Sequence, residues 1–217
     1  WKLDNHTGEE DIMATVVEAL RPSVIVGVSG QPGSFGETVC RAMARINERP
    51  VIFALSNPTT LCECSPRQAY SWTAGKCVYS SGSPFGAVDL EDGQHFEPGQ
   101  GNNAYIFPGV GLGAVLAGGT TITDDDFVRA STALAALVGA SDLAKGSVYP
   151  GLERSREVAV AVACAVADNM WLDGRATKPR PAGDLEAFCR AAMYVPQYSR
   201  KRGRHCTTHV QEEELNH

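Results

Sequence analysis

The sequence predicts an α/β fold that begins with a parallel sheet and continues into a mostly helical region. Three runs rich in β-branched and aromatic residues indicate short strands near residues 24–29, 51–56 and 77–81. Two segments with helical spacing of apolar residues, 35–46 and 65–72, separate these strands. Because strands that alternate with helices are typical of βαβ units, we expect a parallel sheet with right-handed crossovers.

Further helices are predicted on both sides of this pattern. Residues 9–20 have apolar residues at helical spacing after two opening acids, and Arg21-Pro22 should end that helix. Pro108 should either kink the next helix or set its beginning. The polar stretch 85–101 contains Gly and Pro and is predicted to be a long functional or ordered loop. Later helices are predicted over residues 103–118, 124–138, 154–172 and 184–194.

Composition and charge restrict the class of protein. The 217 residues are 43% hydrophobic and 20% charged, which is ordinary for a globular chain with a sizeable core. The formal net charge of −6 argues against nucleic acid or an acidic membrane surface as the main partner. There is no apolar run of about 18 residues, so no membrane span is expected. The seven cysteines are odd in number, which favours reduced thiols and an intracellular location.

Each predicted strand ends in a small polar sequence. The first ends in Ser29-Gly30 and the second in Ser56-Asn57-Pro58, while the third runs into serines and glycine over 80–84. Open parallel sheets bind ligands beyond the carboxyl ends of their strands. These three ends should therefore lie along one crevice.

Three asparagines are candidate ligand contacts, because a carboxamide supplies a donor and an acceptor without adding charge. Pro58 biases Asn57 to an extended backbone and so fixes how its amide leaves the strand, although an Asx turn explains Asn57 equally well. Asn102 and Asn103 precede an apolar helix whose N-terminus would favour an anion. Plain N-capping is the competing explanation for this pair.

Other polar features point to no particular chemistry. The glycines of "GVSGQPGSFG" allow a tight strand-to-helix turn or a cofactor contact, but they do not form the G-x-G-x-x-G dinucleotide fingerprint. Asp124, Asp125 and Asp126 are interpreted as acids that open a helix, and no histidine is a good general base candidate. Cys62 and Cys64 lack a second pair at zinc-site spacing.

Several stretches together resemble the malic enzymes, which oxidatively decarboxylate malate. They occur in the family's order over about residues 9–198 and include "RPSVIVGVSG", "INERPVIFALSNPT", "YSSGSPFG", "PGQGNNAYIFPGVGLG", "YPGLERSREVAVAVA" and "EAFCRAAMYVPQY". The resemblance implies a Rossmann-like sheet, of which this chain holds the later half. It further implies that malate is oxidised by NAD or NADP with help from Mg²⁺ or Mn²⁺, giving pyruvate and CO2.

The resemblance also implies roles for individual residues and a division of the chain. Asn57, Asn102 and Asn103 resemble the amides that contact malate, and Asn57 and Asn103 also those at the nicotinamide. Val28, Ser29 and Gly30 are similar to the loop beside the nicotinamide ribose. We expect residues 1–120 to belong to the NAD(P)-binding domain, 121–198 to a helical region and 199–217 to a polar tail.

The family's catalytic Tyr and Lys and its Glu and Asp metal ligands have no counterpart here and are expected upstream of Trp1. We therefore expect no catalytic or metal-binding residue in this chain and no activity from it alone. The partners implied are malate or pyruvate, the rest of the same enzyme and further copies in a homo-oligomer, in the cytoplasm or a mitochondrion. A non-catalytic nucleotide- or carboxylate-binding module, used in regulation or assembly, is the alternative, and a structural α/β scaffold is a third.

Overall fold

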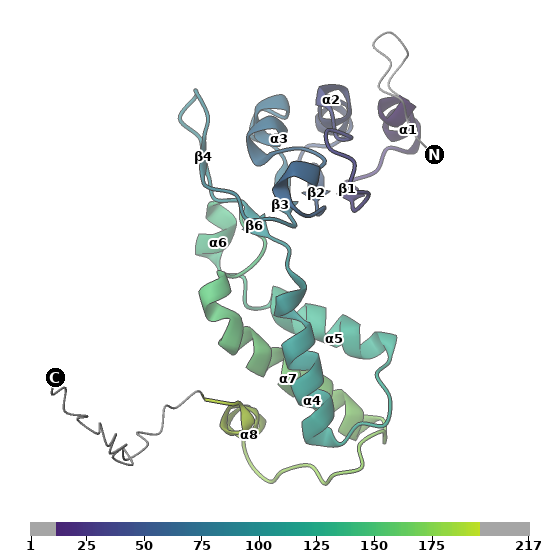
Figure 1. Cartoon of the computed structure of the whole chain (residues 1–217), viewed down its shortest axis with the longest axis vertical. Helices are drawn as coiled ribbons and strands as arrows, with labels where there is room; N and C mark the ends of the chain where they lie inside the picture. Colours follow the sequence, from purple (N-terminus) through teal and green to yellow (C-terminus); the bar gives the residue numbers. More distant parts are fainter. Residues whose placement is uncertain (1–11, 196–217) are drawn as a thin grey trace, which may run out of the picture.

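The computed structural model describes residues 12–195, which form two bodies that follow one another along the chain (Figure 1). The first holds a four-stranded sheet covered by helices, and the second is built of helices. One large apolar core draws on residues 13–96 and another on residues 105–176. The predicted tail, 199–217, and residues 9–11 of the first predicted helix lie outside the described part.

The sheet confirms the predicted α/β class and all three predicted strands. Its order is β1-β2-β3-β6 and every pair is parallel. Val24 lies opposite Val51, which lies opposite Val78, and Ser80 lies opposite Gly99. The bounds are β1 Val24–Gly27, β2 Val51–Ala54, β3 Val78–Ser81 and β6 Gly99–Gln100.

The fourth strand corrects the prediction that residues 85–101 form a loop. This stretch contains a small antiparallel hairpin and then β6. Its two-residue strands have no run of β-branched side chains, so they gave no periodic signal. Gly99 can line up beside β3 because it has no Cβ; one would lie 2.8 Å from the Ser147 hydroxyl. The hairpin strands are β4 Val88–Asp89 and β5 His95–Phe96.

Helices cover one face of this sheet. Ile25, Ile52 and Tyr79 alternate with their neighbours along the strands and are buried in the first core with Val39 and Met43 of α2. Figure 1 shows α1, α2 and α3 in a row beside the strands. Their bounds are α1 Ile12–Leu20, α2 Glu37–Ile46 and α3 Pro66–Trp72.

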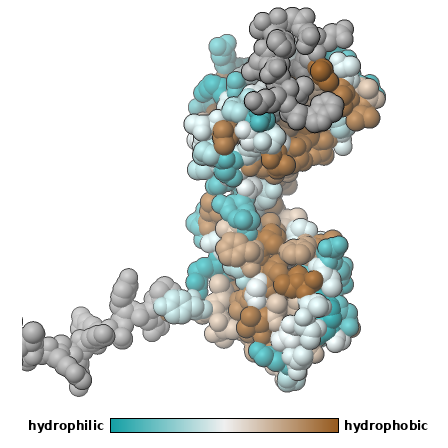
Figure 2. Space-filling view, turned by 45° about the vertical axis from the view of Figure 1, so that its right-hand side comes forward, coloured by the Kyte–Doolittle hydropathy of each residue, from teal (hydrophilic) through white to brown (hydrophobic). Residues whose placement is uncertain are grey.

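The other face of the sheet is apolar and partly uncovered. Val24 and Val26 of β1 are 45% and 54% exposed. Parallel sheets are normally buried on both faces, so exposed valines on β1 are unusual. Figure 2 shows apolar side chains gathered along the lower and right-hand part of the sheet-bearing body. This face is suited to packing against further protein.

The second body is arranged around α7, which contacts α4, α5 and α8. Val158, Val162 and Val166 of α7 are fully buried in the second core. Because α4 shares this core, it packs with the helical body. The sequence predicts a first domain that runs to residue 120 and therefore includes α4. This division into domains stays a prediction. The bounds are α4 Phe107–Ala117, α5 Asp124–Ala135, α6 Ala140–Ala144, α7 Ser155–Leu172 and α8 Leu185–Ala192.

Pro108 sets the beginning of α4 instead of kinking it. The helix starts at Phe107, so the proline lies in the first turn, where its missing N–H needs no partner. The preceding residues 103–105 form a separate short 3-10 turn, η2, although the sequence predicted one helix from residue 103. Two further 3-10 turns are η1 Thr59–Leu61 and η3 Leu152–Arg154.

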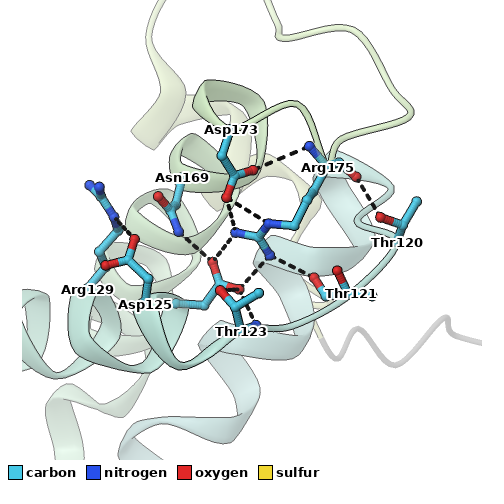
Figure 3. Close-up of polar contacts among 9 residues, drawn as sticks. Thr120, Thr121, Thr123, Asp125, Arg129, Asn169, Asp173 and Arg175 are labelled. Atoms are coloured by element: carbon cyan, nitrogen blue, oxygen red, sulfur yellow. Dashed lines mark hydrogen bonds and ion pairs between the residues drawn. The ribbon is translucent and has the colours of Figure 1, made fainter.

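A buried ion pair joins three segments of the helical body (Figure 3). Arg175 binds the carboxylate of Asp126 through two nitrogens, at 2.7 and 2.9 Å, and Asp126 is 0% exposed. Asn169 of α7 donates to the same carboxylate at 2.8 Å, as does the backbone N–H of Thr123. The contact therefore joins the start of α5, the end of α7 and the segment after it.

Candidate functional site

Four strand ends lie next to one another at the carboxyl edge of the sheet. Backbone hydrogen bonds continue one step beyond the strands: Leu55 N–H donates to Gly27, Gly82 to Ala54 and Gly101 to Ser81. The segments that follow β1, β2, β3 and β6 therefore leave the sheet side by side (Figure 1). They include every residue that the sequence assigned to the site.

The loop after β1 presents exposed groups that face open space. Val28 and Ser29 are exposed and Gly30 is half-buried. Gly30 has a φ of +65°, which favours glycine, and a Cβ built there would meet nothing within 4 Å. Its backbone N–H donates to Ser56 Oγ at 2.8 Å, so the loop is attached to the end of β2.

The Asn57 amide has one fixed side and one open side. Ser83 Oγ donates to Asn57 Oδ1 at 2.6 Å, which leaves the Asn57 NH2 group available to donate elsewhere. Asn57 itself is exposed. Gly82 is needed beside it, because a Cβ there would lie 2.1 Å from the Leu55 carbonyl oxygen and 2.8 Å from Asn57 Nδ2. An acceptor such as a carboxylate or carbonyl oxygen suits this position.

Asn102 and Asn103 follow β6, with β3 between them and the end of β2. Asn102 Oδ1 accepts from the Ala104 N–H at 2.9 Å, so Asn102 caps the η2 turn, as the competing explanation required. Its NH2 group remains a possible donor to a ligand. Asn103 is exposed.

Glu63 is a site component that the sequence did not predict. Its carboxyl group is 0% exposed and accepts hydrogen bonds from Ser29 and Ser56, which end two neighbouring strands. The signal was present in the sequence, since a glutamate between Cys62 and Cys64 is a charged residue among apolar neighbours. Ser83 was also missed, because only folding brings it to Asn57.

Three further observations concern the surroundings of this edge and the described residues as a whole. A cavity of 380 Å³ opens nearby between Gln100, Tyr105, Lys145 and Glu153, but none of the predicted site residues lines it. Within residues 12–195, no group of three or more His, Cys, Asp or Glu side chains could hold a metal ion. In the same residues, no helix is long and apolar enough to cross a membrane.

Comparison with known families decides the identity of this fold. The family model described as the malic enzyme NAD-binding domain matches residues 2–171. The chain belongs to the malic enzyme family. This confirms the resemblance carried by the strand-end motifs.

Individual malic enzymes are similar over most of this chain. The NADP-dependent malic enzyme of Dictyostelium discoideum is 41% identical over 199 residues, which are 92% of this chain and 36% of the relative. The mitochondrial NAD-dependent malic enzyme of Ascaris suum is 44% identical over 183 residues, 84% of this chain and 28% of that enzyme. This chain thus spans about a third of the length of such relatives.

Solved malic enzymes share the fold. The Entamoeba histolytica malic enzyme superposes with a TM-score of 0.66 at 23% identity, covering 82% of this chain and 33% of that one. The Pyrococcus horikoshii malic enzyme gives 0.58 at 24% identity, covering 78% and 34%. At such identities these likenesses support the fold and no further detail.

Proposed function

We propose that this chain forms part of an enzyme that oxidatively decarboxylates (S)-malate to pyruvate and CO2 while reducing NAD or NADP. One observation supports this above all: in a member of the malic enzyme family, the residues matched to its substrate and cofactor motifs follow β1, β2 and β6 at the carboxyl edge of one parallel sheet. Relatives named for NADP and for NAD are both similar to the chain, so the proposal covers both cofactors.

The proposed roles follow the open groups at this edge. Asn57, Asn102 and Asn103 contact malate through their amides, and Asn57 and Asn103 also contact the nicotinamide end of the cofactor. The free NH2 group of Asn57 is suited to a carboxylate or carbonyl oxygen. Val28, Ser29 and Gly30 pass the nicotinamide ribose, for which the open space above Gly30 leaves room.

The remaining chemistry is assigned to the rest of the enzyme. Mg²⁺ or Mn²⁺, when bound, would polarise the carbonyl and stabilise the enolate formed on decarboxylation. Its ligands and the Tyr and Lys acid–base pair are proposed to lie outside this chain. The apolar face that exposes Val24 and Val26 is proposed to pack against that remainder. We further propose a homo-oligomer in the cytoplasm or a mitochondrion.

Replacing Asn102 by Ala in the complete enzyme tests the substrate role. We expect the KM for malate to rise about 10-fold or more, because a lost hydrogen bond to a charged group is worth about 1.5 to 3 kcal/mol. Asn47→Ala is the matched control, since Asn47 caps the far end of α2 by donating to Pro22 and Met43 carbonyls. An unchanged KM for malate in the Asn102 variant would remove that residue from the site.

A binding measurement separates the enzyme from the alternative, a self-sufficient binding module for a nucleotide or carboxylate. Calorimetric titration of the 217-residue chain with NAD, NADP and malate should show weak or no binding if the rest of the enzyme completes the site. Tight binding by this chain alone would favour the module. Malate-dependent reduction of NAD(P) by the complete enzyme would decide for catalysis.

A further inference from the structure

Glu63 is a fully buried carboxyl group at the edge of the candidate site. Within the described residues it has no ion-pair partner, although a buried carboxylate normally requires strong compensation. Compensation comes instead from two serines at neighbouring strand ends. Ser29 donates its backbone N–H at 3.2 Å, and Ser56 donates its N–H at 3.4 Å as well as its hydroxyl.

The two oxygens of Glu63 divide these donors between them. Oε1 accepts from the N–H and the hydroxyl of Ser29 and from the Ser56 hydroxyl, and Oε2 accepts from the Ser56 N–H. Ser56 Oγ in turn accepts from the Gly30 N–H at 2.8 Å. A continuous chain of hydrogen bonds therefore runs from Gly30 through Ser56 to Glu63 and back to Ser29.

The backbone around Glu63 strengthens the same connection. Phe35 N–H donates to the Glu63 carbonyl at 3.2 Å and Gly33 N–H to the Cys62 carbonyl at 3.4 Å, so the turn after β1 is bonded to this segment. Gly27 leaves space for the side chain, because a Cβ there would lie 2.5 Å from Glu63 Cδ. Glu63 therefore contacts the segments that follow both β1 and β2.

We propose that Glu63 is a positioning residue that fixes the loop of Ser29 and Gly30 relative to Ser56 and the adjoining Asn57. This inference rests on the proposed function, since it assigns the first loop to the cofactor and Asn57 to malate. Hydride transfer requires that cofactor and substrate meet at a set distance and angle. A single carboxyl group that accepts from both strand ends couples those two positions.

Glu63→Gln is a sharp test because the amide keeps the shape of the side chain and removes one acceptor. If the amide oxygen replaces Oε1, the Ser56 N–H faces an NH2 group; in the other orientation the Ser29 N–H does. A serine hydroxyl can turn to accept, but a backbone N–H cannot. One of the two strand ends must therefore shift.

The experiment compares the complete enzyme carrying Glu63→Gln with the wild type and with Asp126→Asn, a control at an equally buried carboxylate in α5 of the helical body. We expect kcat/KM to fall about 10-fold or more for malate and for NAD(P), since a misplacement of about 1 Å can cost about 100-fold. Hydrogen exchange should rise together over residues 28–35 and 55–61. The control should lower thermal stability and leave both KM values unchanged.

The outcomes keep the two proposals apart. If Glu63→Gln lowers only the Tm and leaves the kinetics unchanged, the role of Glu63 is merely structural. Unchanged hydrogen exchange over residues 28–35 or 55–61 would also overturn the positioning role. If the wild type does not oxidise malate but Glu63→Gln raises hydrogen exchange in both segments, the proposed function is wrong. The coupling of the two strand ends through Glu63 is then still supported. Should Glu63→Gln not fold, Ser56→Ala cuts the same chain of hydrogen bonds and is expected to raise exchange at residues 28–35.

Discussion

The sheet-bearing body and the helical body each bury one carboxyl group completely, but they compensate it differently. Asp126 in the helical body is bound by the guanidinium of Arg175 through two hydrogen bonds (Figure 3). Glu63 in the sheet-bearing body accepts only from serine hydroxyl and backbone N–H groups among the described residues. A bidentate ion pair has one favourable geometry, whereas hydroxyl groups can turn.

The two buried carboxyl groups also connect different kinds of segment. The Asp126 pair joins α5 to the segment after α7, and α5 in turn packs on α7 and α4. Glu63 lies behind loops that carry the candidate ligand groups. We infer that the Asp126 pair holds the helical body together and that Glu63 aligns the strand ends that carry the candidate ligand groups.

The largest effect is expected from breaking the ion pair with Asp126→Ala. Removing Asp126 takes away the acceptor that Arg175, Asn169 and the Thr123 N–H share, and it leaves the largely buried Arg175, whose side chain is only 14% exposed, with Asp173 as its remaining carboxylate partner. We expect a loss of about 3 to 5 kcal/mol in the free energy of unfolding, measured by urea denaturation. Hydrogen exchange should rise over residues 118–126 and 170–176.

The neighbouring residue supplies the control. Asp125 pairs with Arg129 one helical turn away at 2.9 Å, and both side chains are exposed. Such surface pairs contribute about 0.3 to 0.5 kcal/mol, so Asp125→Ala should change stability little. Equal losses from the two aspartates would contradict the view that Arg175 fastens the helical body.

Acid should weaken the same contact in the unaltered protein. Burial alone would raise the pKa of Asp126, but hydrogen bonds from Arg175, Thr123 and Asn169 outweigh it and hold the pKa well below its usual range. Stability from this group is therefore complete above the unfolded pKa of about 3.9 and is lost as the pH falls further. Urea unfolding between pH 7 and pH 3 should show a steeper loss in wild type than in Asp126→Asn. Parallel pH profiles would contradict the assignment.

Local sequence patterns predicted the parts of the fold that depend on local chemistry. The strands at 24–29, 51–56 and 77–81 were predicted because each is a run of Val, Ile and aromatic residues, and all three are confirmed. Asp124, Asp125 and Asp126 were interpreted as acids in a first helical turn, which the structure confirms. β6 could not be predicted in the same way, because Gly99 and Gln100 become a strand only by pairing with β3.

The site was predictable in outline and not in its supporting contacts. The strand ends that carry Ser29-Gly30 and Asn57 were expected along one crevice, because carboxyl ends of parallel strands coincide, whereas Asn102 reaches the same edge through β6, which was not predicted. Their ligand roles stay predictions. The contacts of Glu63 to Ser29 and of Ser83 to Asn57 span 34 and 26 residues, so no local pattern in the sequence encodes them. The same holds for Asp126 and Arg175, which are 49 residues apart.

A smaller effect is expected from the packing of α4 on α7. A Cβ at Gly109 would lie 2.5 Å from Val162 Cβ and 2.9 Å from the Ala159 carbonyl oxygen, so the two helices would have to separate. We expect Gly109→Ala to lower the free energy of unfolding by about 1 to 3 kcal/mol. Unchanged stability would contradict the close packing of α4 on α7.

Gly111 provides the matched substitution on the opposite side of the same helix and the smallest expected effect. It is exposed, and a Cβ there would meet nothing within 4 Å. Because Ala has the higher helix propensity, Gly111→Ala should raise stability by about 0.5 to 1 kcal/mol in the same urea measurement. If Gly→Ala lowers the free energy of unfolding at position 109 and raises it at position 111, the contact of position 109 with α7 accounts for the difference. A destabilising Gly111→Ala would mean that α4 has a second packing partner on its exposed side.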